Sequence, residues 1–243
     1  MRHCPALLRP AALLLGLALA SPAPAAPLPA LTARYALIAH GLTVARAELQ
    51  SRPTPAGYEL HARVEGGGLT GLFGELGRAE LTGAAVPGRP DSRPLSFLVH
   101  SKPPFTSATT LLYDWPAGRL HARHGESASD LPLEADLADP LAFFVELLEA
   151  RRSGRPAPPR LRVPYASGIV EYRLDSLGRE TVPTALGARD AEKYELSRPD
   201  GGSGRVRITL WLSPADDWLP VLAVRSRKHK ERARAEIESL SRP

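Results

Sequence analysis

Short segments in which apolar and polar residues alternate recur along most of the chain, separated by turn residues. Alternation with a period of two is typical of β-strands that bury one face. It is plain in YELHARV, residues 58–64. The pattern predicts strands at 32–38, 42–50, 58–64, 77–82, 95–101, 109–114, 119–123, 161–164, 170–176, 191–197, 205–212, 219–226 and 233–239.

One segment has helical spacing instead. In ADPLAFFVELLEARRSG, Asp139 suits the N-cap, Pro140 the first helical position and Gly154 the position after the end. Arg151 and Arg152 complement the dipole of the last turn. The spacing i, i+3, i+4, i+7 predicts an apolar helix face that packs on the sheet and borders any ligand there, made of Leu141, Phe144, Val145 and Leu148.

These elements predict an all-β, mainly antiparallel fold. Parallel strands would need helical crossovers, and the chain offers one helix for roughly a dozen strands. We expect a single curved sheet, or an unclosed or closed barrel, with the amphipathic helix packed on it. Residues 155–159, RPAPP, form a stiff connection, but neither side of it has a separate core, so 32–243 is expected to be a single β-rich domain.

The N-terminus has the features of an export signal. Arg2 and Arg9 precede an apolar run at 11–20, and small residues follow. This pattern predicts a signal peptide at 1–25, cut after Ala25, and an extended leader at 26–31. The run is shorter than the roughly 20 residues that span a bilayer, so we expect a periplasmic protein without a transmembrane segment.

Composition narrows the chemistry that the chain can perform. Its one cysteine, Cys4, lies in the predicted signal peptide, which excludes thiol catalysis and cysteine-based zinc sites from the exported part. The net charge of +5 is mild for the length, and an exported protein rarely meets nucleic acid, so no nucleic-acid partner is expected. GGGLTG, at 66–71, lacks the helix of a dinucleotide fingerprint, and we expect no cofactor.

Two other clusters could carry chemistry. Asp216 and Asp217 lie between two tryptophans, but adjacent carboxylates on a turn diverge, so we expect a solvent-facing turn with no catalytic pair. His121 and His124, near Glu126, would point to opposite faces of a strand, so no metal site is expected.

The most basic run is RSRKHKERAR, residues 225–234. Basic residues at a hairpin end are usually solvated and protect exposed sheet edges from aggregation. They can also attract anionic lipid head groups. The candidates for contact with an anionic surface are Arg225, Arg227, Lys228 and Lys230.

Several segments together carry a family resemblance. They include LLYDWPAGRLHA, LADPLAFFVELLEA, VPTALGARDAEKYEL and ITLWLSPADDWLPVLAV, with Thr184, Leu186, Gly187 and Ala191 as specific positions. In this order they resemble the bacterial envelope family catalogued as domain-of-unknown-function family 3108. The final hairpin is similar to that of periplasmic lipoprotein carriers, whose unclosed barrel holds acyl chains under a helical lid. The family has no assigned activity, so the resemblance transfers no catalytic residue.

Two functional hypotheses follow. The first is a non-enzymatic periplasmic protein that binds a lipid, a lipoprotein or another hydrophobic envelope component on the concave face of the sheet. The alternative is an envelope scaffold or assembly protein that binds another protein through a sheet edge or the basic hairpin. The sequence contains no catalytic constellation, although a site assembled from distant strands leaves no local motif.

Overall fold

The structure is a computed structural model that describes residues 28–67, 75–85, 92–102, 107–134, 136–165, 168–199 and 206–243. Within these ranges the helices are α1 (Pro140–Arg152) and the 3-10 helix η2 (Pro214–Asp216). The strands are β1 (Leu31–Ala39), β2 (Leu42–Thr54), β3 (Gly57–Gly66), β4 (Glu75–Ala85), β5 (Ser92–Ser101), β6 (Ser107–Asp114), β7 (Arg119–His124), β8 (Ser127–Pro132), β9 (Arg160–Tyr165), β10 (Gly168–Thr184), β11 (Gly187–Ser197), β12 (Val206–Leu212), β13 (Pro220–Arg227) and β14 (Lys230–Ser241).

All 14 strands belong to one sheet, in the order β8-β7-β6-β5-β4-β3-β2-β1-β14-β13-β12-β11-β10-β9. Neighbouring strands run antiparallel throughout. The first and last strands pair, with Thr32 opposite Ser241, and so join two meanders into one curved surface. β8 and β9 end the order without pairing to each other, so the sheet is an open barrel. The predicted all-β antiparallel fold with one helix is confirmed.

The predicted strands correspond to every observed strand except β8. Its sequence, SASDLP, has no apolar alternation because the strand lies at the edge of the sheet and is largely exposed. It forms by pairing with β7, with His124 opposite Ser127. β10 is longer than predicted because a register shift between Ser176 and Arg179, with Gly178 at a φ of +90°, bends the strand without ending it.

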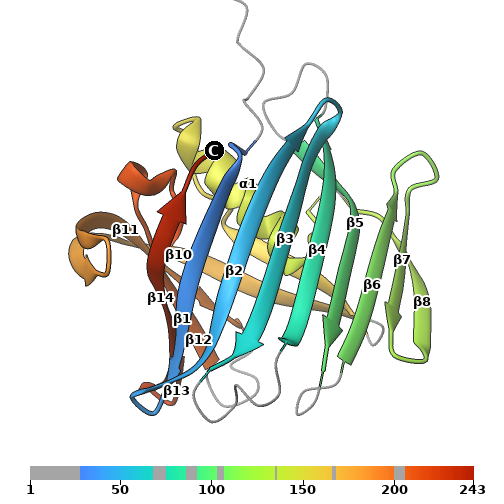
Figure 1. The fold of residues 1–243 in the computed structure, drawn as a ribbon. Helices are drawn as coiled ribbons and strands as arrows, with labels where there is room; N and C mark the ends of the chain where they lie inside the picture. The colour runs from blue at the N-terminus through green and yellow to red at the C-terminus, as the bar shows by residue number, and fades with distance from the viewer. Residues whose placement is uncertain are drawn as a thin grey trace, which may run out of the picture.

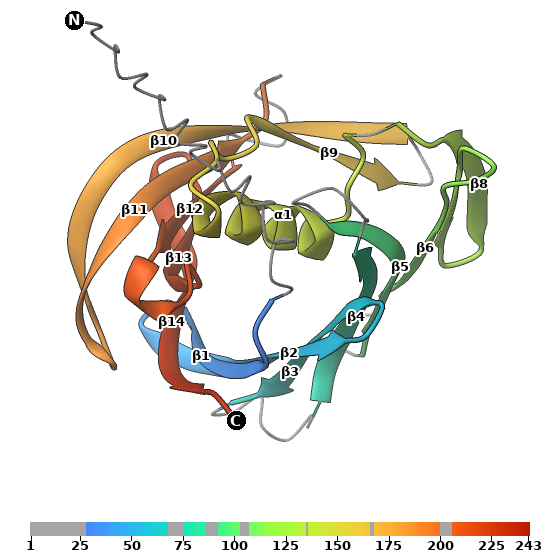
Figure 2. The same cartoon turned by 90° about the horizontal axis from the view of Figure 1, so that it is seen from above.

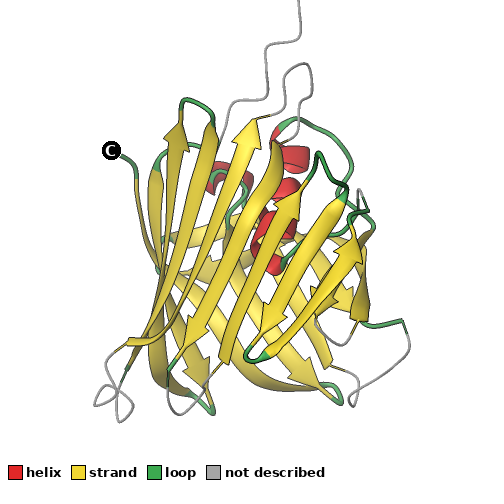
Figure 3. Cartoon of the chain, turned by 90° about the vertical axis from the view of Figure 1, so that its right-hand side faces the viewer, coloured by secondary structure: helices red, strands yellow, loops and turns green. Residues whose placement is uncertain are grey.

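The helix begins and ends where its capping residues predict. The Asp139 carboxylate accepts hydrogen bonds from the backbone N–H groups of Leu141 and Ala142, both at 2.9 Å. At the other end Gly154 has a φ of +71°, which stops the helix. Figures 2 and 3 show that α1 lies inside the curve of the sheet.

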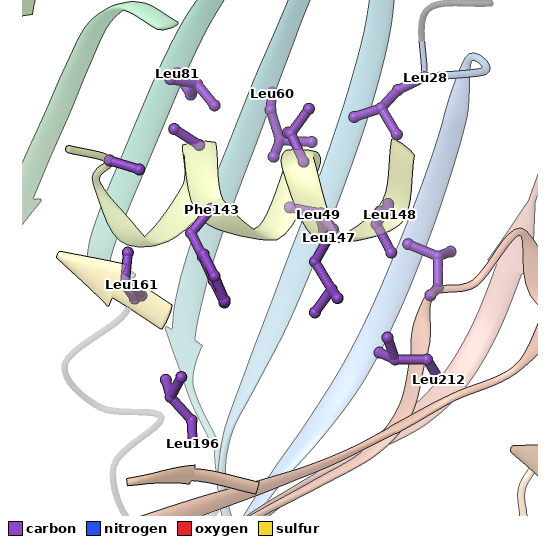
Figure 4. Packing of buried hydrophobic residues seen from close by; sticks show 14 of the residues in the cluster. Leu28, Leu49, Leu60, Leu81, Phe143, Leu147, Leu148, Leu161, Leu196 and Leu212 are labelled. Atoms are coloured by element: carbon purple, nitrogen blue, oxygen red, sulfur yellow. The ribbon is translucent and has the colours of Figure 1, made fainter. Parts of the chain in front are cut away.

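Because the sheet wraps around it, α1 is buried on more than one side. Val145 and Leu148 of the predicted face are buried, and so are Phe143 and Leu147 beyond it. Figure 4 shows Phe143 and Leu147 on the side of the helix opposite Leu60 and Leu81, where Leu161 of β9 and Leu196 of β11 also lie. The helix therefore fills the interior of the open barrel as part of its core.

A buried polar pair joins the start of the helix to the sheet. Asp139 is fully buried. Tyr113, on β6, donates its hydroxyl to Asp139 Oδ2 at 2.9 Å and accepts from the Asp139 backbone N–H at 3.0 Å. Burial raises the pKa of Asp139 to about 6, although the hydrogen bonds that its carboxylate accepts from Ala142, Tyr113 and Leu141 favour the charged form. This pair fixes the position of α1 against β6.

Candidate functional site

A pocket lies where the end of α1 meets β10 and β11, and its volume is about 500 Å³. We call it the helix-end pocket. Its lining combines charged and apolar side chains, a composition suited to an amphipathic ligand. The lining residues are Arg151, Pro156, Ala157, Pro159, Leu174, Ser176, Gly178, Arg179, Glu192 and Tyr194.

The apolar wall follows from how the helix ends. The Arg155 backbone N–H donates to the Ala150 carbonyl at 2.8 Å, which turns the chain out of α1. The proline-rich connection then runs back along β10, where the Leu174 N–H donates to the Pro159 carbonyl at 2.8 Å. Proline side chains are rigid, so Pro156 and Pro159 form a preorganised apolar surface beside Leu174.

The polar wall is a cluster of charges centred on Glu192, which is only 8% exposed. Its carboxylate accepts from Arg151 Nη2 at 3.1 Å, from Arg179 Nη2 at 2.7 Å and from the Tyr194 hydroxyl at 2.6 Å. Arg151 also lies over the ring of Trp218, 4.8 Å from its centroid. The guanidinium groups come from α1 and from the bent part of β10, while β11 supplies the carboxylate.

This cluster carries a positive charge. Burial alone would raise the pKa of Glu192, but the hydrogen bonds from Tyr194, Arg179 and Arg151 outweigh it and hold the pKa below its usual range. Burial, and then the bond to Glu192, raises the pKa of Tyr194 to about 12, so its hydroxyl stays protonated. One carboxylate thus faces two guanidinium groups, and the exposed Arg179 has N–H groups left to bind an anion.

The sequence did not single out this cluster. Glu192, Tyr194 and Leu196 alternate along a predicted strand, so the sequence places one acidic residue on a face that is otherwise apolar. A buried carboxylate needs hydrogen-bond or ion-pair partners, so an acidic residue on an apolar strand face could have indicated that Glu192 belongs to a charge cluster. Its main partner could not be predicted, because Arg151 is 41 residues away in the sequence.

The structure separates the four helix residues predicted to border a ligand. Val145 and Leu148 are buried in the core. Leu141 and Phe144 pack against the core but keep part of their surface exposed. The lining of the helix-end pocket includes none of the four.

The two histidines of β7 have separate partners. His121 Nδ1 lies 2.7 Å from Asp130 Oδ1, and His124 Nδ1 lies 2.8 Å from Thr109 Oγ1. Among the residues that the structure describes, no three histidine, cysteine, aspartate or glutamate side chains are grouped so that they could hold a metal ion. Most of the glycine-rich segment 66–71 lies outside the described residues.

The expectation that Asp216 and Asp217 both face solvent is wrong for Asp216. η2 turns its carboxylate inward, where it is 5% exposed and accepts from Arg189 Nε at 2.8 Å. Asp217 lies at the surface and pairs with Arg242 at 2.8 Å. Trp211 packs at the end of β12 and donates its indole N–H to Glu180. The two adjacent carboxylates diverge, so they form no acid pair.

The two aspartates are therefore expected to differ in their effect on stability. Asp216→Asn removes the charge that pairs with a largely buried guanidinium and should lower the free energy of unfolding by about 2 kcal/mol. Asp217→Asn breaks an exposed pair and should change it by less than about 0.5 kcal/mol. Urea denaturation of both variants measures the difference; equal losses would contradict the burial of Asp216.

The residues predicted to meet an anionic surface are all at the tip of one hairpin. Arg225, Arg227, Lys228 and Lys230 lie where β13 turns into β14, and all four are exposed. Among the described residues, no helix is long and apolar enough to cross a membrane.

The fold and the site define a class: an open antiparallel barrel with an internal helix and an amphipathic pocket at the end of that helix. The sequence profile of the family described as protein of unknown function DUF3108 matches residues 32–228. The chain belongs to this family. No curated protein matches it.

Three solved structures are similar. A β-barrel-like protein of the unknown-function family DUF1849 from Brucella abortus is 11% identical, with a TM-score of 0.52 over 89% of this chain and 99% of that one. An exported protein with a YmcC-like fold from Bacteroides fragilis is 10% identical, with a TM-score of 0.42 over 89% and 97%. A lipoprotein from Parabacteroides distasonis is 11% identical, with a TM-score of 0.40 over 88% and 95%. The first similarity shows a shared fold.

Proposed function

We propose that the protein is exported to the periplasm through a cleaved signal peptide at 1–25 and binds a lipid or another hydrophobic envelope component without catalysing a reaction. The observation that carries the proposal is the helix-end pocket. Its apolar wall suits an acyl chain, and its unbalanced guanidinium charge suits a carboxylate or phosphate head group.

The proposal gives each wall of the pocket a role. Arg179 is the group that contacts the head of the ligand, because its side chain is 71% exposed while Arg151 is held between Glu192 and Trp218. The tail lies along Pro156, Pro159 and Leu174. Two residues of the predicted helix face, Leu141 and Phe144, are partly exposed and would contact a longer tail. The other two, Val145 and Leu148, are buried and pack in the core.

The expected result is that a fluorescent fatty acid binds the protein and that Arg179→Gln weakens binding about tenfold, since a charge-assisted hydrogen bond contributes about 1.5–3 kcal/mol. Arg173→Gln is the matched control, because Arg173 lies on the same strand, is exposed and pairs with Asp175 outside the pocket. Fluorescence titration measures both affinities.

Ser176→Trp supplies a second test, because Ser176 is exposed and lines the pocket, so a large side chain there fills the space without disturbing the core. This variant should no longer bind the fluorescent fatty acid, while its thermal stability should equal that of the parent protein. Mass spectrometry of lipids extracted after native purification identifies the natural ligand. A protein that binds no probe and carries no lipid would exclude the proposal.

The alternative, an assembly protein that binds a partner strand, is favoured by the unequal edges of the sheet. Residues 136–138 lie along the outer edge of β9: the Ala138 N–H donates to the Arg162 carbonyl at 3.1 Å, and Arg162 pairs with Asp136 at 2.7 Å. β8, at the other end of the sheet order, is hydrogen-bonded to β7 alone among the described strands. Capture of one stoichiometric envelope protein, lost when Ala128 on β8 is replaced by proline, would support this alternative.

A further inference from the structure

Two hairpin turns lie side by side at one end of the sheet. One joins β1 to β2 at His40 and Gly41, and the other joins β13 to β14 at Lys228 and His229. They are neighbours because β1 pairs with β14, with Ile38 opposite Arg234. Figure 1 shows both turns at the lower left, while α1 lies toward the other end.

Basic side chains are concentrated on the second turn. Between residues 225 and 236 the chain has six basic and two acidic residues. Both acids lie beside the same residue, since Arg234 is 3.6 Å from Glu231 and 2.8 Å from Glu236. The other five basic side chains are exposed and have no ion-pair partner among the described residues: Arg225, Arg227, Lys228, Lys230 and Arg232.

The first turn adds a large apolar side chain to this surface. Leu42 is 69% exposed, more than the other exposed large hydrophobic residues of the described chain. A single exposed leucine is ordinary, but this one lies at the turn that neighbours the β13–β14 turn, whose five exposed cations have no ion-pair partner in the described part of the chain. We call Leu42 and these five residues the basic tip.

The backbone of the second turn has a conformation that is unusual for a lysine. Lys228 and His229 have φ values of 51° and 60°, in the left-handed region. Glycine and asparagine favour this conformation, and two-residue hairpin turns usually contain them. A lysine at the first of these positions is disfavoured by the local geometry, and strain of this kind concentrates at functional positions.

We propose that the basic tip docks onto the surface of a lipid bilayer that contains anionic phospholipid. The arginines and lysines are attracted to the head groups, and Leu42 enters the boundary between head groups and acyl chains. The surface combines two weak signals, charge and one apolar side chain, which together give reversible attachment. This inference does not depend on the helix-end pocket.

Co-sedimentation with vesicles tests the proposal. At low salt the protein should bind vesicles of phosphatidylcholine and phosphatidylglycerol but not vesicles of phosphatidylcholine alone. Each basic residue near an anionic surface strengthens partitioning about fivefold, so the triple variant Arg227→Gln, Lys228→Gln, Lys230→Gln should bind about 100-fold more weakly. Added salt should weaken binding of the parent protein.

The matched control removes three arginines at the opposite ends of the strands. Arg52, Arg93 and Arg119 are exposed and lie near the end of β2, the start of β5 and the start of β7. The triple variant of these residues to glutamine has the same net charge as the tip variant and should bind vesicles like the parent protein. Equal losses in both triple variants would overturn the proposal, because net charge and not the tip would then determine binding.

The variant Leu42→Ser distinguishes binding to a bilayer from binding to a soluble polyanion. It should weaken vesicle binding about tenfold, since the leucine loses its apolar contact with the lipid. The control is Leu98→Ser, at a residue 45% exposed in β5, and it should have no effect. Binding to soluble polyglutamate that matches vesicle binding, together with no effect of Leu42→Ser, would overturn the proposal in favour of an acidic protein partner.

Discussion

Replacing Asp139 with alanine is expected to lower the free energy of unfolding by about 3 kcal/mol at pH 5. The substitution removes the cap from the first turn of α1, which leaves the N–H groups of Leu141 and Ala142 unpaired. It also takes away the acceptor of the buried Tyr113 hydroxyl. Chemical denaturation followed by tryptophan fluorescence measures the loss.

Two control variants separate the cap from the contact with the sheet. Asp139→Asn keeps an oxygen that caps the helix and should retain most of the stability. Tyr113→Phe keeps the cap but removes one hydrogen bond to the carboxylate and the acceptor of the Asp139 backbone N–H, and it should lower the free energy of unfolding by about 2 kcal/mol. If Asp139→Ala were as stable as the parent protein, the buried cap would not hold α1 in place.

The pH dependence of Asp139 has a definite sign. The folded pKa of about 6 lies above the ordinary value of 3.8, so the folded protein binds this proton more tightly than the unfolded chain. The stability that protonation contributes is complete below the ordinary value and is lost as pH rises through about 6. Asp139→Asn should remove this step, which corresponds to about 3 kcal/mol, from a plot of unfolding free energy against pH.

Replacing Glu192 with alanine is expected to lower the free energy of unfolding by about 3 kcal/mol at pH 7. The substitution leaves the Arg151 guanidinium, whose side chain is 18% exposed, without its carboxylate, and an unpaired buried charge is strongly destabilising. Arg179 is exposed and can return to water, so most of the loss comes from Arg151. Thermal and urea denaturation of the variant measure it.

The double variant Arg151→Met, Glu192→Leu tests whether the unpaired charge of Arg151 causes this loss of stability. Removing both charges leaves no unpaired group, so the double variant should be much more stable than Glu192→Ala. A double variant as unstable as the single one would point to lost packing instead. The lowered pKa of Glu192 adds a second check. The stability that the charged Glu192 contributes is present above the ordinary pKa of 4.5 and is lost as pH falls below that value. This pH dependence has the opposite sign to that of Asp139.

Most of the fold could be predicted from the sequence because its signals are local. Alternation along 58–64 predicts β3, and the capping residues Asp139 and Gly154 predict the bounds of α1. β8 could not be predicted, because an exposed edge strand needs no apolar alternation and forms only by pairing with β7. The inward position of Asp216 could not be predicted either, because Asp216 lies in η2 and its partner Arg189 lies on β11.

The sequence by itself determined the class of the fold, the bounds of the helix, the basic residues of the β13–β14 turn and the kinship with the family. All of these depend on neighbouring residues or on composition. Only the tertiary structure decided that the barrel stays open, that α1 is buried on more than one side and that Arg151, Arg179 and Glu192 meet in a pocket. These features depend on strand register and sheet curvature, which bring together residues that no local pattern connects.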